Sequence, residues 1–383
     1  MSFTPKTQEL IKREFQTLST EYFNTAYFGP SPLRSKEKVD KMMAIELDPS
    51  HFAYGNYLQF PDRTREQFAK LLGVSADSIS HATSSTDVIN NLALGFKFIP
   101  GDIVAAINKD YPSNILPWMV CQKRNKDIHF ELIDLAGKPY PTIEWLKEKL
   151  PAQTRIFNIS WVQFDTGKKI DLVELGKFLK ERNIFFVVDA TQGFGGLAIT
   201  PEELKYIDVL TVSSYKWMCG PYGHAFAYYS SAALKLIEQT HGNWAVSSNS
   251  KNVYDLLNYT TDTLPGARKY DRGQPMNLLA LSCFEGALDL FLEIGISEIE
   301  KHNKSLVKFF LENYPKKNFD VVTPIDHAGN IICVKSKGSD PILLEKKLEE
   351  HNVQVSVRQG NIRISFHLFN TIAQVEKLIS ALG

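Results

Sequence analysis

Two side chains near the middle of the chain combine burial with reactivity. Asp189 comes near the end of the apolar run IFFVVDA at residues 184–190, and Lys216 follows the run VLTVSS at residues 209–214. A buried carboxylate is costly unless it meets a cation or several donors. A lysine in poor solvent has its pKa lowered from about 10.4, which frees a lone pair for attack on a carbonyl carbon. Taken singly, each has a structural explanation: an acid that caps the next loop, or a lysine that neutralises Asp189 or reaches the surface.

Taken together, the two side chains indicate a cofactor. Pyridoxal phosphate needs an amine for a Schiff base and an acid that keeps its ring nitrogen protonated. It also needs donors for its phosphate, and Ser84, Ser85 and Thr86 stand at the start of an apolar-periodic segment. Hydroxyls and unpaired N–H groups converge at a helix N-terminus, where the helix dipole favours an anion. A plain N-cap would need only one of these three hydroxyls. The sequence therefore predicts a pyridoxal 5'-phosphate site.

The elements that must position these residues alternate between strands and helices. Several strands lack polar alternation, as expected for a mainly parallel α/β sheet covered on both faces by helices. Ligands then collect beyond the carboxyl ends of the strands. The predicted strands are 102–108, 127–134, 154–160, 184–190, 209–214 and 225–230, and the predicted helices include 85–96, 141–150 and 171–182.

The last third of the chain has a different organisation. Residues 240–275 are polar and rich in Gly, Asn, Ser and Thr, which is typical of a long functional loop or a connection between domains. A long apolar helix follows, and then shorter strands and helices that predict a compact α+β domain. We expect an N-terminal segment at 1–22, a large cofactor-binding domain at 23–260, and a connecting helix with a small C-terminal domain at 261–383.

Composition narrows the class of partner. The 43 Lys and Arg residues balance 43 Asp and Glu residues, so there is no charge excess that favours nucleic acid or an anionic membrane. The four cysteines lie far apart and form no CxxC pair, which predicts neither a metal site nor a redox dithiol. No apolar stretch approaches the roughly 20 residues that span a bilayer. We therefore predict a cytoplasmic protein with a small-molecule substrate.

The order of several motifs resembles that of a known family. The motifs SSTDVIN, DYPSNILPW, SWVQFDTGKKIDL, VVDATQGFGG, SSYKWMCGPYG and IRISFHLFNT follow one another as in the class V aminotransferases of fold type I. This superfamily includes cysteine desulfurases, isopenicillin N epimerase-like proteins and kynureninases. The similarity runs from about residue 23 to the C-terminus. It implies a seven-stranded, mainly parallel sheet in the large domain, a smaller α+β domain, and a homodimer with active sites near the subunit interface.

The resemblance also implies roles around the cofactor ring. Lys216 matches the Schiff-base lysine, and Asp189 matches the partner of the pyridine nitrogen. Gln192 matches the residue that contacts the ring hydroxyl, and Tyr111 falls where the family stacks an aromatic ring or histidine on the cofactor. Arg363 in NIRISF matches the arginine that binds the substrate carboxylate, a task that suits its planar fork.

A second set of matches concerns the phosphate. Ser85 and Thr86 match the phosphate-loop threonines of the family, and Ser213 and Tyr215 match its second pair of phosphate ligands. Tyr215 stands where histidine is common, but a phenol also donates. Gln274 stands in RGQP at the threonine of a Gly-Thr-Pro loop that reaches the neighbouring subunit's phosphate. Gln163 is a further candidate for cofactor contact.

The sequence departs from the desulfurases in the placement of its thiols. Desulfurases carry a nucleophilic cysteine on a loop shortly before the carboxylate-binding arginine, and the corresponding interval here, VSVRQGNIR, has none. Cys333 falls inside an apolar strand and Cys219 in a tight turn, so both are interpreted as structural. We expect transamination or epimerisation of an amino acid or a small carboxylated amine. The alternatives are elimination of the lyase type without a persulfide cysteine, and a catalytically silent cofactor-binding protein.

A nicotinamide oxidoreductase is a further alternative. It would depend on DATQGFGG as a glycine-rich turn at residues 189–196. That stretch lacks GxGxxG spacing, and its acid precedes the glycines instead of following them by about 20 residues. The pattern therefore favours pyridoxal phosphate over a dinucleotide.

Overall fold

A computed structural model describes residues 3–52, 59–138, 140–250, 252, 254–255, 257–273 and 277–383. Its largest element is a seven-stranded sheet in the order β2-β8-β7-β6-β5-β3-β4, in which only β8 runs against the others. The six predicted strands are all present, and β2 is the seventh. The strands are β2 (Ile79–Ala82), β3 (Ile103–Ile107), β4 (His129–Ile133), β5 (Thr154–Ser160), β6 (Phe185–Asp189), β7 (Val209–Ser213) and β8 (Ala225–Tyr229).

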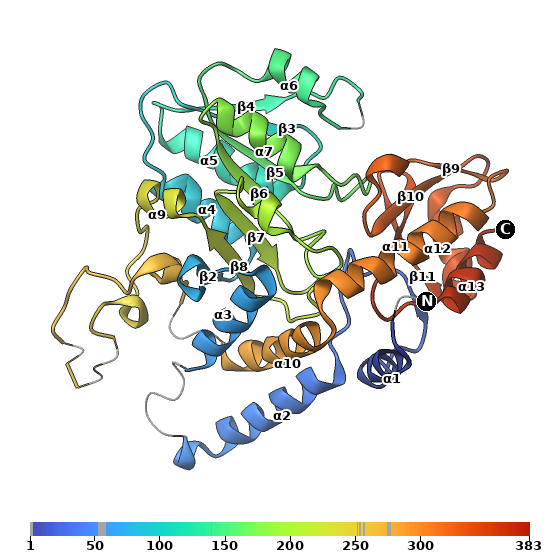
Figure 1. Cartoon of the computed structure of the whole chain (residues 1–383), viewed down its shortest axis with the longest axis horizontal. Helices are drawn as coiled ribbons and strands as arrows, with labels where there is room; N and C mark the ends of the chain where they lie inside the picture. The colour runs from blue at the N-terminus through green and yellow to red at the C-terminus, as the bar shows by residue number, and fades with distance from the viewer. Residues whose placement is uncertain are drawn as a thin grey trace.

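Helices cover both faces of this sheet, which confirms the predicted α/β fold (Figure 1). Alternate strand residues face two separate cores: Phe186 and Val188 of β6 join one, whereas Phe185 and Val187 join the other. This explains the continuous apolar runs, because both faces of each strand are buried. The first core packs on α3 (Gln59–Leu72), α6 (Ile143–Lys149), α7 (Leu172–Glu181) and α10 (Leu278–Ile294), and the second on α4 (Ser85–Gly95), α5 (Leu116–Arg124) and α9 (Ser231–Leu236).

A smaller antiparallel sheet lies at the other end of the molecule (Figure 1). Its order is β12-β13-β10-β9, and a third core packs it on helices α11 and α13. The elements are α11 (Ile296–Asn313), β9 (Phe319–Val321), β10 (Ile331–Ser336), α12 (Pro341–Glu350), β11 (Val353–Gln354), β12 (Ser356–Arg358), β13 (Asn361–Ser365) and α13 (Ile372–Leu382).

The N-terminal residues carry α1 (Pro5–Glu14), β1 (Glu21–Tyr22) and α2 (Leu33–Leu47), and the short helix α8 (Pro201–Leu204) precedes β7. The segment VQVSVR at residues 353–358 is divided between two sheets. Its first part, β11, pairs in parallel with β1, whereas β12 pairs with β13. The domain boundaries at residues 22/23 and 260/261 stay a prediction. No helix in the described part of the chain has both the length and the apolar character to span a membrane.

Candidate active site

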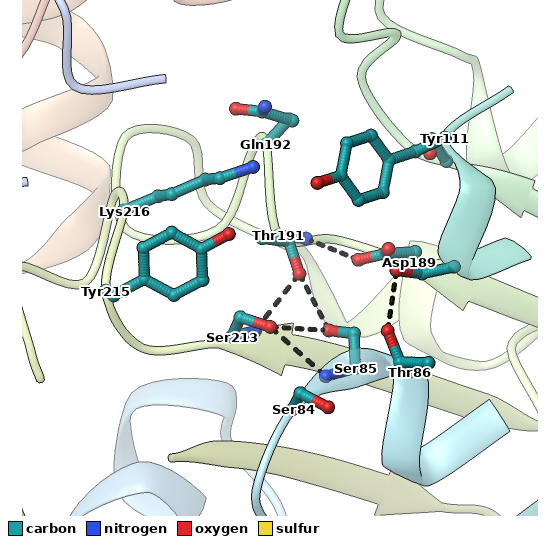
Figure 2. A pocket seen from close by; sticks show the side chains of 12 residues that line it. Ser84, Ser85, Thr86, Tyr111, Asp189, Thr191, Gln192, Ser213, Tyr215 and Lys216 are labelled. Atoms are coloured by element: carbon teal, nitrogen blue, oxygen red, sulfur yellow. Dashed lines mark hydrogen bonds between the residues drawn. The ribbon is translucent and has the colours of Figure 1, made fainter. Parts of the chain in front are cut away.

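A pocket opens beyond the carboxyl ends of β6 and β7, where the parallel sheet was expected to collect ligands. It contains about 520 Å³ of space free of protein atoms, part of it open to solvent. Figure 2 shows side chains from several elements entering it, with Lys216 on one side and a group of hydroxyls below. The lining residues are Ser84, Ser85, Thr86, Tyr111, Ser113, Ser160, Asp189, Thr191, Gln192, Ser213, Tyr215 and Lys216.

Lys216 is held in a tight turn that follows β7. The amide of Cys219 donates to the Lys216 carbonyl (3.0 Å), and the Gly29 amide donates to the carbonyl of Tyr215 (2.8 Å). A side chain at Gly29 would collide with the Lys216 carbonyl oxygen, so only glycine lets the N-terminal segment pass this closely. Lys216 is 5% exposed. Burial, reinforced by the charge of Arg363, lowers the Lys216 pKa to about 8, although Asp189 opposes this shift.

The lowered pKa gives a prediction for assembly with the cofactor. Schiff-base formation needs the neutral amine, so a pKa of about 8 leaves roughly a tenth of Lys216 reactive at pH 7, against fewer than one in a thousand for an ordinary lysine. The rate at which apoenzyme develops the visible Schiff-base band is expected to rise with pH, with a midpoint near pH 8, and to level off above it. Stopped-flow absorbance would measure it. In Arg363→Gln the pH midpoint of this rate should move upward, because the Arg363 charge that helps to lower the Lys216 pKa is removed. A midpoint near pH 10 in the unmodified protein would contradict the lowered pKa of Lys216.

Asp189 ends β6 and faces the same space as Lys216. Its carboxylate accepts a hydrogen bond from the Thr191 amide (2.9 Å). Burial raises the Asp189 pKa, and the Thr191 contacts and the charge of Lys216 oppose that rise. A cationic group within the pocket would stabilise the ionised carboxylate further. Lys216 Nζ lies 5.2 Å from the centre of the Tyr111 ring, so lysine, acid and aromatic ring surround one volume.

Asp110 fixes the loop that carries Tyr111, and the sequence analysis missed it. Its carboxylate accepts hydrogen bonds from the backbone amides of Tyr111 (2.6 Å) and Ser160 (2.9 Å), from the Ser160 hydroxyl (2.5 Å) and from Asn114 Nδ2 (3.2 Å). A buried acid next to a predicted strand end, in DYPSN after residues 102–108, was the signal that could have drawn attention to it.

A cluster of hydroxyls forms the opposite end of the pocket. Ser85 Oγ lies 2.8 Å from Thr191 Oγ1 and 3.0 Å from Ser213 Oγ, and the Ser85 amide donates to Ser213 Oγ (3.1 Å). Thr86 Oγ1 pairs with Ser113 Oγ at 2.7 Å. Figure 2 shows Ser84, Ser85 and Thr86 at the start of α4. Thr191 and Ser113 were not predicted, because neither stands in a helix N-cap or beside the lysine.

The other phosphate candidates are placed differently. Ser84 lines the pocket, but its hydroxyl caps α4 by accepting the Asp87 amide (3.1 Å). Tyr215 stacks on Tyr222 with ring centres 4.0 Å apart, and Tyr215 also lines the pocket. Gln274 lies outside the described residues. The predicted phosphate roles of Ser85, Thr86, Ser213 and Tyr215 are therefore compatible with one shared location.

Removing a hydroxyl from this cluster is expected to weaken cofactor binding. A hydrogen bond to a charged group is worth about 1.5–3 kcal/mol, so Ser213→Ala should raise the Kd for pyridoxal phosphate about 10- to 100-fold. Equilibrium dialysis in a Lys216→Ala background would measure it without the covalent link. Ser214→Ala is the matched control, since the Ser214 hydroxyl donates instead to the carbonyls of Pro221 (2.6 Å) and His224 (3.0 Å). A Kd within twofold for Ser213→Ala would remove Ser213 from the phosphate site.

Gln192 is held by protein groups at both ends of its amide. Its Nε2 donates to the Ala26 carbonyl (3.1 Å), and its Oε1 accepts from the Trp217 indole (3.1 Å). One N–H stays available for a ligand. Gln163, the weaker candidate, lies outside the pocket lining and donates to the Ser160 carbonyl (3.3 Å).

Arg363 comes from the smaller sheet and lies outside the pocket lining. Its Nε donates to Ser356 Oγ (3.2 Å) and its Nη1 to the Phe164 carbonyl (3.1 Å). Its Nη2 is buried and, among the described residues, has no hydrogen-bond partner. Burial, with the nearby charge of Arg358, lowers the Arg363 pKa to about 10, which still leaves it protonated at pH 7. A buried cationic donor without an acceptor is a site for an anion.

The residues present suit pyridoxal 5'-phosphate. Donors gather at a helix N-terminus for a phosphate, a buried acid lies where a ring nitrogen needs one, and a buried lysine with a lowered pKa opens onto the same space. Arg358, which the sequence analysis did not single out, adds a second cation near Lys216 and Arg363. Each of these individual residue roles stays a prediction.

The comparisons with known proteins agree with this chemistry. The family model for class V aminotransferases matches residues 51–378. A probable cysteine desulfurase of Methanothermobacter thermautotrophicus is 24% identical, with 97% of this chain and 96% of that protein covered. An uncharacterized aminotransferase of Bacillus subtilis is 21% identical, with 98% and 97% covered.

Solved structures share the fold over nearly the whole chain. The apo cysteine desulfurase of Thermococcus onnurineus superposes with a TM-score of 0.84 at 19% identity, covering 98% of this chain and 96% of that one. A mutant of C-DES with glycine covalently linked to its pyridoxal phosphate gives a TM-score of 0.85 at 18% identity, covering 97% and 98%. The chain belongs to the class V aminotransferase family and is a pyridoxal 5'-phosphate-dependent enzyme of fold type I.

Proposed function

We propose that the enzyme binds the carboxylate of an amino acid, or of a small carboxylated amine, through Arg363 and moves a proton at Cα with Lys216, in a transamination or an epimerisation. The observation that carries this proposal is the buried Nη2 of Arg363, which has no acceptor among the described residues, on an arginine whose charge is felt by Lys216. A bidentate carboxylate would satisfy that nitrogen.

Each group then has a separate task. Bound pyridoxal phosphate supplies an electron sink for the bond that breaks at Cα. Asp189 would pair with a protonated ring nitrogen, and the hydroxyls of Ser85 and Ser213 would hold the phosphate. Arg363 would orient the substrate through its carboxylate, and the Lys216 amine would take and return the proton at Cα.

The thiols support a mechanism without a cysteine nucleophile. Burial raises the pKa of all four thiols, that of Cys333 to about 12, and none of the four lines the pocket. Cys219, the nearest in sequence to the lysine, is fully buried and adopts a left-handed backbone (φ 51°) within its turn. The protonated thiol is a poor nucleophile.

Replacing the thiols should therefore leave activity nearly intact. We expect Cys219→Ala and Cys333→Ala each to keep kcat within about threefold of the unmodified enzyme, with any larger effect seen in thermal stability as buried volume is lost. Turnover and melting curves, measured on the same preparations, separate the two effects. Loss of more than about a hundredfold in kcat with an unchanged melting curve would show that a thiol takes part.

A lyase that eliminates sulfur or another leaving group is the second candidate. The cystine C–S lyase C-DES, solved in complex with its reaction product cysteine persulfide, aligns with a TM-score of 0.85 at 18% identity. Elimination also begins with removal of the Cα proton, for which Lys216 can act as the base, and it then needs a substrate that carries a leaving group on its side chain. The carboxylate site and the cofactor are shared by all three reactions.

A product screen of the purified holoenzyme distinguishes these reactions. The protein would be incubated with each amino acid, with and without a keto-acid acceptor. Accumulation of the amine form of the cofactor supports transamination, and loss of optical activity without it supports epimerisation. Release of sulfide or pyruvate would overturn both in favour of a lyase. A cofactor spectrum that responds to no amino acid would overturn all three in favour of a silent binding protein.

We also propose a homodimer. Tyr254, Leu257 and Tyr259 in the predicted connecting loop are 99%, 80% and 85% exposed, and a subunit contact would cover such apolar groups. Sedimentation velocity of the holoenzyme tests this: a particle of about 87 kDa, twice the 43.4 kDa chain, supports it, and a particle of chain mass at micromolar concentration would overturn it.

A further inference from the structure

A second cavity lies between α6, α7 and the short helix η7 (Ile325–His327), and it shares no lining residue with the cofactor pocket. It contains about 620 Å³ of space free of protein atoms, part of it open to solvent. The segment leading to α7 forms one wall and is joined to the approach to the small sheet, because Lys168 pairs with Ala328 in an isolated antiparallel bridge. The cavity therefore lies where the two sheet systems meet.

A buried lysine opens onto this cavity. Lys168 is 2% exposed, and its Nζ lies 3.4 Å from the centre of the Tyr140 ring. Within the described part of the chain, its ammonium has neither a hydrogen bond nor an ion pair. Burial lowers the pKa of Lys168 to about 8, while the charges of Glu174 and Asp171 oppose that shift. A buried ammonium that meets only a ring face lacks an oxygen acceptor.

An unpaired carboxylate lines the same cavity. Glu174 is in the first turn of α7, and its backbone amide donates to Asp171 Oδ1 (2.9 Å), so Asp171 is used as the cap of that helix. Glu174 is exposed, and its carboxylate has no hydrogen bond or ion pair with any described residue. Lys168 and Glu174 are close enough for their charges to interact, yet no ion pair forms between them. Opposite charges that share a cavity without pairing leave room for a ligand that carries both.

Part of the remaining wall is apolar, beside the polar side chains of Thr142, Glu144, Asp171 and His327. Leu146, Ile170 and Leu175 line it and are themselves buried. A ligand with an aliphatic group would remove this surface from water at about 25 cal/mol per Å². The Tyr140 ring lies beside Lys168 at the same cavity and adds a further apolar face.

We propose that this cavity binds an α-amino acid with an aliphatic side chain, whose carboxylate pairs with Lys168, whose ammonium faces Glu174 and whose side chain lies on Leu146 and Leu175. The site is separate from the cofactor pocket, so the proposal does not depend on which reaction the enzyme catalyses. Binding would place a ligand at the junction between α7 and the approach to β10.

Equilibrium dialysis of radiolabelled leucine against borohydride-reduced holoenzyme tests the proposal. Reduction fixes the cofactor to Lys216, so leucine cannot form a Schiff base in the catalytic pocket. We expect saturable binding that weakens at least about tenfold in Lys168→Met and in Glu174→Gln, because each variant loses a charge-assisted contact. Lys169→Met is the matched control and should bind as the unmodified enzyme does, since Lys169 lies outside the cavity lining.

Analogues with a single charge decide the ligand class. 4-Methylpentanoate lacks the ammonium and 3-methylbutylamine lacks the carboxylate, so each should compete at least about tenfold less well than unlabelled leucine. Equal competition by 4-methylpentanoate would overturn the proposal in favour of a simple anion site. Absence of binding, or binding that is unchanged in both Lys168→Met and Glu174→Gln, would also overturn it. Glu174 is exposed, so its variant keeps the test decisive if Lys168→Met fails to fold.

Discussion

The Lys216→Ala variant is expected to lose the visible Schiff-base absorbance completely, and its kcat is expected to fall by at least about 10²-fold. The absorbance disappears because the only buried amine lining the described cofactor pocket is removed. The fall in turnover is the typical contribution of a general acid–base group, to which the loss of covalent attachment adds. Absorbance spectra, borohydride fixation followed by peptide mass spectrometry, and product formation measure the three effects on one preparation.

Two further variants make this test specific to the amine. Lys216→Arg keeps a buried cation but cannot form the Schiff base, so it should be as inactive as Lys216→Ala. Lys169→Ala should retain both colour and turnover, because Lys169 lies outside the pocket lining. Its Nζ lies instead 5.6 Å from the centre of the Trp161 ring. Borohydride fixation at another lysine, or a coloured and active Lys216→Ala protein, would refute the assignment of Lys216.

The Arg363→Lys variant is expected to lower kcat/KM by about 10²- to 10³-fold, most of it through KM. A lysine supplies the charge but not the planar pair of donors, and truncating one partner of a buried, hydrogen-bonded charge pair typically costs 2–5 kcal/mol. The Ser356 hydroxyl and the Phe164 carbonyl, which now accept from Arg363, would also lose their donors. Steady-state kinetics on the substrate found by the product screen measures the effect.

A milder change to the same group checks its cause. Ser356→Ala removes only the partner of Nε and leaves the guanidinium in place, so we expect a fall in kcat/KM of about tenfold or less. The Schiff-base spectrum of Arg363→Lys should be retained, because the arginine does not line the cofactor pocket. If Arg363→Lys and the unmodified enzyme had equal KM for the substrate, the carboxylate would have to bind elsewhere, with Arg358 the next group to test.

The pattern of residues along the chain was enough to predict which segments form the sheet and which side chains end its strands. The continuous apolar runs before Asp189 and before Lys216 can be satisfied only where both faces of a strand are covered, and parallel strands bring their carboxyl ends to one edge. Three hydroxyls before an apolar-periodic helix likewise predicted hydroxyl donors at this edge, where Ser85 joins a hydroxyl cluster. Local pattern was sufficient for these features because each depends on residues close together in the chain.

Contacts between distant segments could not be predicted from local pattern and depend on the folded chain. Thr191 joins Ser85 and Ser213 across two strands and a helix N-terminus, and no local pattern marks it as part of that group. The run VQVSVR divides between two sheets because separate partners, β1 and β13, compete for its backbone hydrogen bonds. Whether a buried charge is paired depends on which groups folding brings within reach. That is why the buried donor of Arg363, and the separation of Lys168 from Glu174, could be seen only once the chain was folded.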